Sequence, residues 1–385
     1  IPADDWNRIS GTSNPFIRYA FLHSLEASAS TNKHNGWTPH HILIRQKAEL
    51  IGVIPGYLKS HSYGEYVFDW SWAEAYQRYQ LNYYPKLLTA IPFTPSIGPR
   101  LLLRPEFEQC DIITEILKLL IAYLKESNIP SWHLLFPDKP AYQTLLQANT
   151  EAGSNLIIRH GCQFHWQNNH YLHFDNFLAD LNSRKRKNIR KEREKVNKQG
   201  IEFQILEGKD INQSVLDIYY PFYQATYLKR GQSPYLHKAF FQQVCEKMPE
   251  QIILCMAKKD GDFVAGAWFF KSENTLYGRN WGCLEEYKNL HFECCYYQGI
   301  EYCINQGLAF FDAGAQGEHK VLRGFEPVDT SSFHWIQDPQ FRAAIDSFLQ
   351  QETLHIQRYK EGTRQCLPYK DEAILDKVLK KAPDR

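Results

Sequence analysis

The sequence predicts an α+β protein made of two related domains, each with a mixed, mostly antiparallel sheet flanked by helices. The chain has 385 residues, which is more than one ordinary hydrophobic core and fits two. A hydrophobic content of 43% is ample for globular folding, and the same order of elements occurs twice along the chain. We therefore expect one domain over residues 1–175, a second over 176–345, and a C-terminal helix and tail over 346–385.

Each copy of the repeat opens with a helix. Residues 14–26 and 233–245 both start with a helix-capping residue followed by proline, and apolar residues then recur at helical spacing. We expect both segments to be helical from their proline onward.

A β-hairpin follows in each copy. Residues 41–54 and 255–268 each contain two apolar runs separated by a polar turn, with Gly52 and Gly266 at the same place in the second run. Each glycine is followed, at the same distance, by a Tyr-Gly pair, and we expect residues 63–65 and 277–279 to lie on a further strand.

A helix and a buried strand complete each copy. In the first copy residues 114–126 predict the helix and residues 132–136 the strand. In the second copy residues 290–306 predict a helix that ends at Gly307, before a strand over 308–312. Two such domains in one chain can form a cleft between them, and clefts of this kind are frequent ligand sites.

Between the copies lies a short basic helix, residues 183–198. Of the seventeen residues from 182 to 198, nine are Lys or Arg and two are Glu. Gly200 can end this helix before a strand over 201–206, and a further amphipathic helix is expected over 341–358.

The basic helix has two interpretations. Lys185, Arg186 and Arg190 are candidates for contacts with the phosphates of a tRNA. Alternatively, the charge run is a solvated helix face that its own glutamates stabilise through i,i+3 and i,i+4 pairs.

Composition narrows the class of protein further. The net charge of +1 gives no global preference for an anionic partner. Nine cysteines without any CxxC spacing are typical of reduced thiols in a cytoplasmic protein. No apolar run is long enough to cross a membrane, so we expect no membrane insertion, and no residue cluster has metal-ligand spacing.

Four motifs, in order along the chain, resemble a known group of bacterial proteins. They are residues 57–66, residues 277–282, residues 290–297, and residues 314–320 followed by Arg-Gly-Phe at 323–325. Together they resemble the FemAB-like group of the GNAT acyl-CoA N-acyltransferase superfamily, over nearly the whole chain. That group is similar, more distantly, to the Fem peptidyltransferases, which are built from tandem GNAT-type domains and add amino acids from aminoacyl-tRNA to peptidoglycan precursors.

The resemblance implies tandem GNAT-like domains and an N-acyltransferase activity. It implies aminoacyl-tRNA or acyl-CoA as co-substrate, with no tightly bound cofactor. The basic run 184–194 and the segment 320–325 are similar in position to basic segments of the Fem enzymes. Three features depart from these patterns. The segment 314–320, with its acid and histidine, differs from the Fem pattern, there is no heptad run for a coiled-coil arm, and no glycine-rich pyrophosphate loop follows Trp281.

The segment after the last predicted strand carries the candidate catalytic groups. Acyl transfer to an amine needs a base for the amine, a well-placed donor carbonyl and stabilisation of the oxyanion. Either Glu318 or His319 can serve as the general base, and flanking glycines let the backbone approach a ligand closely. Lys320 and Arg323 are candidates for binding a phosphate or a substrate carboxylate. Alternatively, this segment is a surface loop held by salt bridges.

Candidate substrate-binding or donor-binding side chains lie elsewhere in both copies. Alternation along a strand would place three side chains of each predicted strand on one face. A further pair stands near the start of the helix at 290, where an anion is favoured; a cap with a first-turn carboxylate is the alternative. The candidates are Tyr277, Arg279, Trp281, His61, Tyr63, Glu65, His291 and Glu293.

The sequence thus predicts an N-acyltransferase that moves an aminoacyl or acyl group from charged tRNA or a thioester onto an amine. The acceptor would be a peptide, a cell-wall precursor or a small metabolite. The alternative is a non-catalytic protein that binds peptidoglycan-type or peptide ligands in the same cleft.

Overall fold

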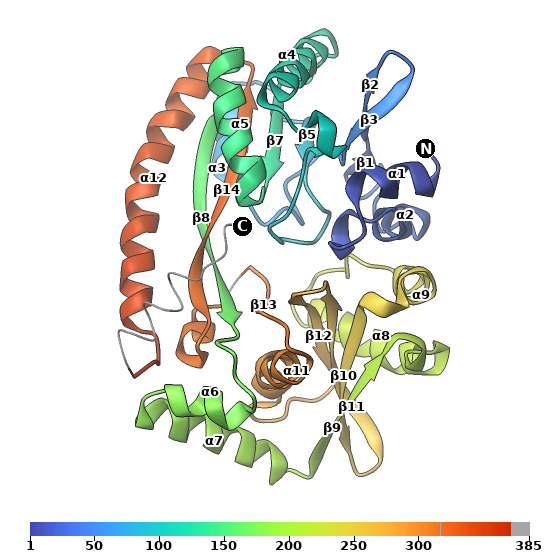
Figure 1. Cartoon of the computed structure of the whole chain (residues 1–385), viewed down its shortest axis with the longest axis vertical. Helices are drawn as coiled ribbons and strands as arrows, with labels where there is room; N and C mark the ends of the chain where they lie inside the picture. The colour runs from blue at the N-terminus through green and yellow to red at the C-terminus, as the bar shows by residue number, and fades with distance from the viewer. Residues whose placement is uncertain (316, 371–385) are drawn as a thin grey trace. The chain divides into compact units, whose positions relative to one another are not determined.

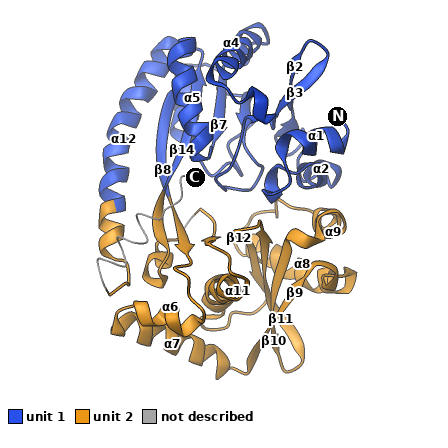
Figure 2. Ribbon diagram, viewed as in Figure 1, with its two compact units in different colours: residues 1–162, 329–360, 383–385 blue, residues 163–328, 361–382 orange. Residues whose placement is uncertain are grey.

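The computed structural model describes residues 1–315 and 317–370 of the chain (Figure 1). Within this part the chain forms two compact units (Figure 2), one of residues 1–162 and 329–360 and the other of residues 163–328 and 361–370. The chain therefore leaves the first unit at residue 162 and returns to it at residue 329. The domain ranges 1–175, 176–345 and 346–385 stay a prediction.

The first unit is built mainly from the N-terminal part of the chain. In order, it contains α1 (Ala3–Ser10), a 3-10 helix (Pro15–Ile17), α2 (Tyr19–Ala27), β1 (Trp37–Pro39), β2 (Ile42–Gln46), β3 (Glu49–Ile54), β4 (Tyr57–Lys59), α3 (Trp70–Arg78), β5 (Lys86–Thr89), β6 (Leu102–Leu103), a 3-10 helix (Pro105–Phe107), α4 (Cys110–Glu126), β7 (Ser131–Leu135) and α5 (Lys139–Ala152). Strand β8 (Ile157–Gln167) begins in this unit, strand β14 (Glu326–Ile336) ends in it, and most of α12 (Pro339–Gln365) belongs to it.

The strands of the first unit pair in the order β1-β4-β5-β7-β14-β8, and β2-β3-β6 form a separate three-stranded sheet. The pair β5–β7 is parallel, whereas β1–β4, β4–β5 and β7–β14 are antiparallel. On one face, Trp132 and Leu134 of β7 pack with buried residues of α4 and α5. Another core cluster joins α3 to α12, so helices and sheet form the layers that the sequence predicts.

The second unit repeats this arrangement with more residues in strands. In order, it contains α6 (Phe174–Asp180), α7 (Ser183–Asn197), β9 (Ile201–Glu207), a 3-10 helix (Gly208–Asp210), α8 (Gln213–Leu228), α9 (Lys238–Lys247), a 3-10 helix (Pro249–Gln251), β10 (Ile252–Lys259), β11 (Asp262–Lys271), β12 (Thr275–Cys283), α10 (Leu290–Phe292), a π-helical turn (Glu293–Tyr297), α11 (Gln298–Gln306), β13 (Phe310–Asp312) and a 3-10 helix (Glu318–Arg323).

The strands of the second unit pair in the order β8-β13-β12-β11-β10-β9. The pair β12–β13 is parallel and the pairs β8–β13, β9–β10, β10–β11 and β11–β12 are antiparallel. Each unit thus contains a parallel pair, and its other pairs of stated direction are antiparallel. Helix α8 packs closely against β11 and β12, because Gly266 and Gly282 have no side chain that would meet it.

The local predictions with the strongest patterns are confirmed. Both hairpins form, as β2–β3 and β10–β11, and Gly307 ends α11 in the left-handed conformation at φ 66°. The basic helix α7 begins at Ser183, but its capping side chain is Asn182, which accepts a hydrogen bond from the Lys185 N–H at 3.0 Å.

Two predicted helices differ from their expected bounds. The segment 14–26 splits into a 3-10 helix and α2, because Arg18 lies between them in an extended conformation. In the second copy the helix begins only at Lys238, so Ser233 and Pro234 lie outside it. The backbone before α9 is held instead by Leu236, whose N–H donates to the Tyr223 hydroxyl at 3.0 Å.

The predicted strand over residues 63–65 is wrong. Strand β4 ends at Lys59, and residues 60–69 form a loop. Gly64 and Tyr66 have φ values of 80° and 63°, which a strand does not accommodate.

Candidate functional site

In the second unit, the carboxylate of Asp312 organises the end of strand β13. It is fully buried and accepts hydrogen bonds from Arg279 Nη2 and from the Gly314 N–H, both at 2.8 Å. His165 Nε2 lies 3.7 Å from its Oδ1. Burial alone would raise the pKa of Asp312, but the charge of Arg279 holds this pKa well below its usual range. The ion pair therefore fixes the start of the segment that carries the predicted catalytic residues.

Arg279 reaches Asp312 from a β-bulge in strand β12. Trp268 of β11 pairs with Asn280, while the next residue pairs with Gly278, so the register of the strand pair skips Arg279. The bulge also reverses the alternation: Tyr277 lies opposite Phe270 and Trp281 opposite Ala267. The prediction that Tyr277, Arg279 and Trp281 share one face is therefore wrong.

Lys320 and Arg323 lie on the 3-10 helix that follows, and both are buried with internal partners. Lys320 Nζ donates to the Gly314 carbonyl at 2.6 Å, and burial lowers the pKa of this lysine to about 8. The Arg323 guanidinium lies 3.6 Å from the Phe292 ring centroid and donates to both carboxylate oxygens of Glu192 and to the Tyr297 hydroxyl. In this arrangement both cations hold the site together.

His319 lies on the same 3-10 helix and is exposed to solvent, but Tyr296 and Gly317 contact its ring. Its Nε2 is hydrogen-bonded to the Tyr296 hydroxyl at 2.8 Å, and the ring passes close over the α-carbon of Gly317. A Cβ at Gly317 would lie 2.6 Å from the imidazole, and its φ of 116° also favours glycine. Burial, then Arg323 and Lys320, lower the pKa of His319, so the imidazole is neutral near pH 7.

A π-helical turn brings His291 to the same place. The Tyr296 ring lies 5.5 Å from both His291 and His319, and the two imidazole centroids are 6.2 Å apart. A π-helix closes hydrogen bonds between residues five apart, so His291 and Tyr296 come to lie on one side of it; π-turns are frequent at functional sites. Burial lowers the pKa of His291 to about 4, and Trp281 packs edge-on against its ring at 5.5 Å.

Two other predicted residues, Glu318 and Glu293, have different environments. Glu318 is exposed to solvent. Glu293 is buried and paired with Arg193, whose Nη2 lies 3.0 Å from its Oε1, and it also accepts from Gln298. Burial raises the pKa of Glu293 against the opposing charge of Arg193.

The basic helix α7 is held by ion pairs of its own side chains, and the contact with tRNA phosphates stays a prediction. Glu192 and Arg193, on its inner face, bind Arg323, Glu293 and Glu301, while Glu194 pairs with Lys198 as a helix-surface pair at 2.5 Å. The three phosphate candidates stand apart from these contacts. Arg190 is exposed with Asp175 3.0 Å away, and Lys185 and Arg186 are half-buried near the helix start.

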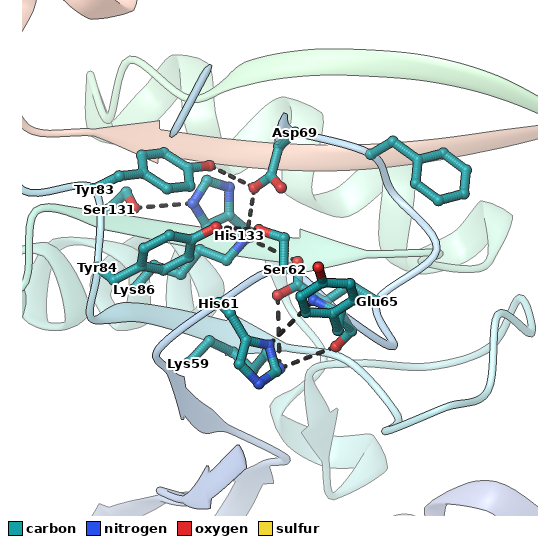
Figure 3. A network of polar contacts seen from close by, with 12 residues as sticks. Lys59, His61, Ser62, Glu65, Asp69, Tyr83, Tyr84, Lys86, Ser131 and His133 are labelled. Carbon is teal, nitrogen blue, oxygen red and sulfur yellow. Dashed lines mark hydrogen bonds and ion pairs between the residues drawn. The ribbon is translucent and has the colours of Figure 1, made fainter. Parts of the chain in front are cut away.

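In the first unit, the residues predicted on one strand face take three different environments, and Figure 3 shows two of them, His61 and Glu65. Tyr63 is exposed and packs edge-on against Trp70 at 4.7 Å. His61 is half-buried, with its Nε2 3.0 Å from the Asn35 carbonyl. Glu65 is buried beside Lys86, whose Nζ is 2.8 Å from its Oε2.

Lys86 is the centre of this buried network (Figure 3). Besides Glu65, its Nζ donates to Asp69 and, at 2.9 Å, to the Ser62 hydroxyl. Burial opposes the charge on Lys86, but the two carboxylates together raise its pKa, so it stays an ammonium. Burial raises the pKa of Glu65 to about 7, whereas Asp69 is held below its usual range by Lys86 despite its own burial.

Two histidines from distant parts of the chain meet beside this network. His133 of β7 and His334 of β14 face each other across the strands, with their Nδ1 atoms 2.7 Å apart. Their Nε2 atoms are hydrogen-bonded to Ser131 at 2.9 Å and to Ser332 at 2.7 Å. Burial lowers both pKa values, that of His133 to about 3, so both rings are neutral and have opposite tautomers.

Sequence reasoning missed several of these polar residues. Tyr296, Asp312, Lys86, Asp69 and the two facing histidines have partners far away in the sequence, so no local spacing marks them. The nearest available signal was Asp312 at the end of a predicted strand in the second copy. Among the described residues there is no disulfide, no group of His, Cys, Asp and Glu that could hold a metal ion, and no helix long and apolar enough to cross a membrane.

The fold and these residues agree with one protein family. The family model of FemAB-like proteins, described as peptidoglycan biosynthesis/recognition, matches residues 1–371, and the chain belongs to this family. A search of curated proteins found no match.

Two solved structures are similar to this chain over most of both lengths. A crystal structure of FemX has 12% identity and a TM-score of 0.53, covering 89% of this chain and 97% of its own. A conserved protein of unknown function from Bacteroides thetaiotaomicron VPI-5482 has 11% identity and a TM-score of 0.51, covering 87% and 98%. The resemblance to the FemAB-like group is confirmed, and so is the predicted α+β fold class, with a mostly antiparallel sheet flanked by helices in each unit.

Proposed function

We propose that this chain is an N-acyltransferase that moves an aminoacyl or acyl group onto an amine. The acceptor is a peptide, a cell-wall precursor or a small metabolite, and the donor is aminoacyl-tRNA or acyl-CoA, used in the cytoplasm without a tightly bound cofactor. Membership of the FemAB-like family supports this class of reaction. The observation that carries the proposal is the exposed His319, which lies on the Tyr296 hydroxyl beside His291.

His319 is the general base in this proposal. If its Nε2–H donates to the Tyr296 oxygen, its Nδ1 keeps a free lone pair for the proton of the attacking amine. Its lowered pKa keeps the ring neutral at pH 7 and ready to accept that proton. The amine nitrogen bonds to the donor carbonyl carbon, and the bond from that carbon to the ester oxygen of the tRNA or to the thioester sulfur breaks. The leaving oxygen or sulfur takes the proton that His319 accepted and departs as the tRNA hydroxyl or the thiol.

Tyr296 completes the site as a hydrogen-bond donor. Burial raises the pKa of Tyr296, so it remains a phenol at the pH of the reaction. While its oxygen accepts from His319, its own proton is available to the developing oxyanion. Lys320 and Arg323 act here as positioning residues, since their charged groups hold Gly314, Glu192 and the His319 carbonyl.

The test of this site compares two neighbouring residues. We expect His319→Ala to lower kcat/KM by roughly 10²- to 10⁴-fold, the usual contribution of a general base. Glu318→Gln changes an adjacent exposed side chain and should leave the rate within about threefold of the wild type. Transfer of a labelled group from aminoacyl-tRNA or acyl-CoA to an amine is the measurement. Full activity of His319→Ala, or inactivity of Glu318→Gln alone, would reject His319 as the base.

The donor is tested by equilibrium binding at two salt concentrations. Charged tRNA, uncharged tRNA and acyl-CoA are each titrated into the purified protein. If α7 contacts tRNA, the double variant Lys185→Gln/Arg186→Gln should lower the salt slope by about 2, while Lys33→Gln, outside α7, should not change it. Binding of acyl-CoA alone would assign the thioester donor, and binding of none would favour a non-catalytic protein.

A further inference from the structure

A cavity of about 590 Å³ opens in the first unit, beside the buried Lys86 network. One wall is helix α3, where Trp70 and Gln77 stand two turns apart on one face, and another is Asn82, Tyr83 and Tyr84. His61 closes a further side. The volume is within the range of natural ligand pockets. Of the candidates from the sequence only His61 lines the cavity, and the residues proposed for the chemistry of acyl transfer, His319 and Tyr296, do not.

The lining is aromatic and polar with almost no charge. Among the described residues that line the cavity there is no Lys or Arg, and Glu74 is the only carboxylate. Lys86 lies behind this wall, fully buried and neutralised by Glu65 and Asp69. A phosphate or carboxylate ligand would therefore find no cation to pair with, which disfavours anions.

The polar groups of the lining can both donate and accept hydrogen bonds. The side-chain amides of Gln77, Gln80 and Asn82 make no hydrogen bond within the described part of the chain and are exposed at the cavity. Each amide offers two N–H donors and a carbonyl oxygen. A ligand that fits them carries groups with the same double capacity.

Tyr84 has this double capacity because of the network behind it. The Lys86 ammonium can only donate, so the Ser62 hydroxyl accepts from it at 2.9 Å. The single Ser62 proton then goes either to Tyr84, whose oxygen is 2.8 Å away, or to Asp69. In the first case Tyr84 presents its proton to the cavity, and in the second case a lone pair. A ligand hydroxyl complements both arrangements.

The aromatic rings add flat apolar faces. Trp70 is partly exposed and is held edge-on by Tyr63 at 4.7 Å, and Tyr83 is fixed because its hydroxyl donates to Asp69. Such rings pack against apolar C–H surface while polar groups at their edges make hydrogen bonds. Apolar faces combined with many hydroxyl groups are the chemistry of a sugar ring.

We propose that this cavity is a binding site for an uncharged saccharide, with a ring stacked on Trp70 and its hydroxyls on Gln77, Asn82 and Tyr84. The site belongs wholly to the first unit, and it does not depend on the proposed acyl transfer. It gives the first unit a recognition role separate from the chemistry of the second.

The test is calorimetric titration of the full-length protein with glucose, N-acetylglucosamine, cellobiose and chitobiose. Inorganic phosphate and n-butylamine serve as the anionic and cationic probes. We expect saturable millimolar or tighter binding of at least one saccharide and none of phosphate. Trp70→Ala should weaken that binding at least tenfold and Gln77→Ala about three- to tenfold, which is one hydrogen bond. Ser71→Ala, on the same helix outside the lining, should bind as the wild type does.

Three results would overturn the proposal. The first is that no saccharide of the panel binds, and the second is that phosphate or n-butylamine binds as tightly as the best saccharide. The third is that Trp70→Ala and Gln77→Ala both bind like Ser71→Ala. Trp70 and Gln77 are exposed enough for their variants to fold, and thermal melting checks that they do.

Discussion

Glu326 begins strand β14 with its carboxyl group buried in the second unit. Its Oε1 has no hydrogen-bond partner among the described residues, and the side chain is 6% exposed. Burial raises the pKa of Glu326 from 4.5 to about 8, against the opposing charge of Arg364. The folded protein therefore holds a proton on Glu326 at neutral pH, whereas the unfolded chain releases it near pH 4.5.

This proton makes stability depend on pH in a defined direction. The stability that Glu326 contributes is fully present below pH 4.5 and is lost as the pH rises toward 8, by roughly 2 to 5 kcal/mol. Urea unfolding of the wild type and of Glu326→Gln across this range measures the effect as their difference. Glu318→Gln, which removes an exposed carboxylate, should keep the wild-type pH dependence. A difference between wild type and Glu326→Gln that does not change with pH would contradict the buried proton.

At the scale of elements, the contact of α8 with strand β12 depends on a single glycine. A Cβ at Gly282 would lie 1.9 Å from the Phe222 carbonyl oxygen, which is backbone and cannot turn aside. Thr226 of α8 also donates to the Trp281 carbonyl at 2.7 Å, so helix and strand are held at this separation.

Gly282→Ala should therefore destabilise the protein by about 2 to 4 kcal/mol, because the backbones must move apart. Gly362→Ala, in α12 with nothing within 4 Å of the added Cβ, is the matched control. It should be neutral or stabilise by about 0.5 to 1 kcal/mol, since alanine favours helices. Thermal and chemical unfolding of both variants makes the comparison, and equal effects would show that the close approach is unimportant.

The elements that sequence reasoning predicted well are those whose signal is local. The hairpins over 41–54 and 255–268 and the stop at Gly307 each follow from a few consecutive residues. Helix α8 was not predicted; Pro221 within it is a residue that normally ends helices. The alternation predicts a strand where the structure has the loop after β4, because the attraction of Glu65 to Lys86 across 21 residues leaves no mark in that alternation.

The candidate site was predictable in part for the same reason. The segment with Glu318 and His319 was found from its glycines and from the family resemblance. Its hydrogen-bond partner Tyr296 lies 23 residues earlier on a π-helical turn, which ordinary helical periodicity does not reveal. The His133–His334 pair spans 201 residues and depends on which strands are neighbours.

At the scale of the whole molecule, the first unit contains two separate stretches of chain within residues 1–370 as the structure describes them. A fragment of residues 1–175 lacks β14 and α12, and with them Phe333 and Trp335 of its main core cluster. We expect this fragment to show no cooperative unfolding transition, because losing even one large buried aromatic costs about 3 to 5 kcal/mol. Joining residues 329–365 after residue 162 through a flexible linker should restore the transition, as followed by near-UV circular dichroism. A cooperative transition of the 1–175 fragment alone would contradict this account.

The return of the chain to the first unit also sets an order of events during synthesis. Strand β7 emerges from the ribosome about 200 residues before β14, whose residue His334 pairs with its His133. Translation adds about 5 to 20 residues per second, so the edge of β7 that pairs with β14 stays without this neighbour for roughly 10 to 40 seconds. During this time β7 exposes an unpaired backbone that other nascent chains can join. The N-terminal unit is thus completed late, and for this protein ribosome-associated chaperones matter most for the part that is translated first.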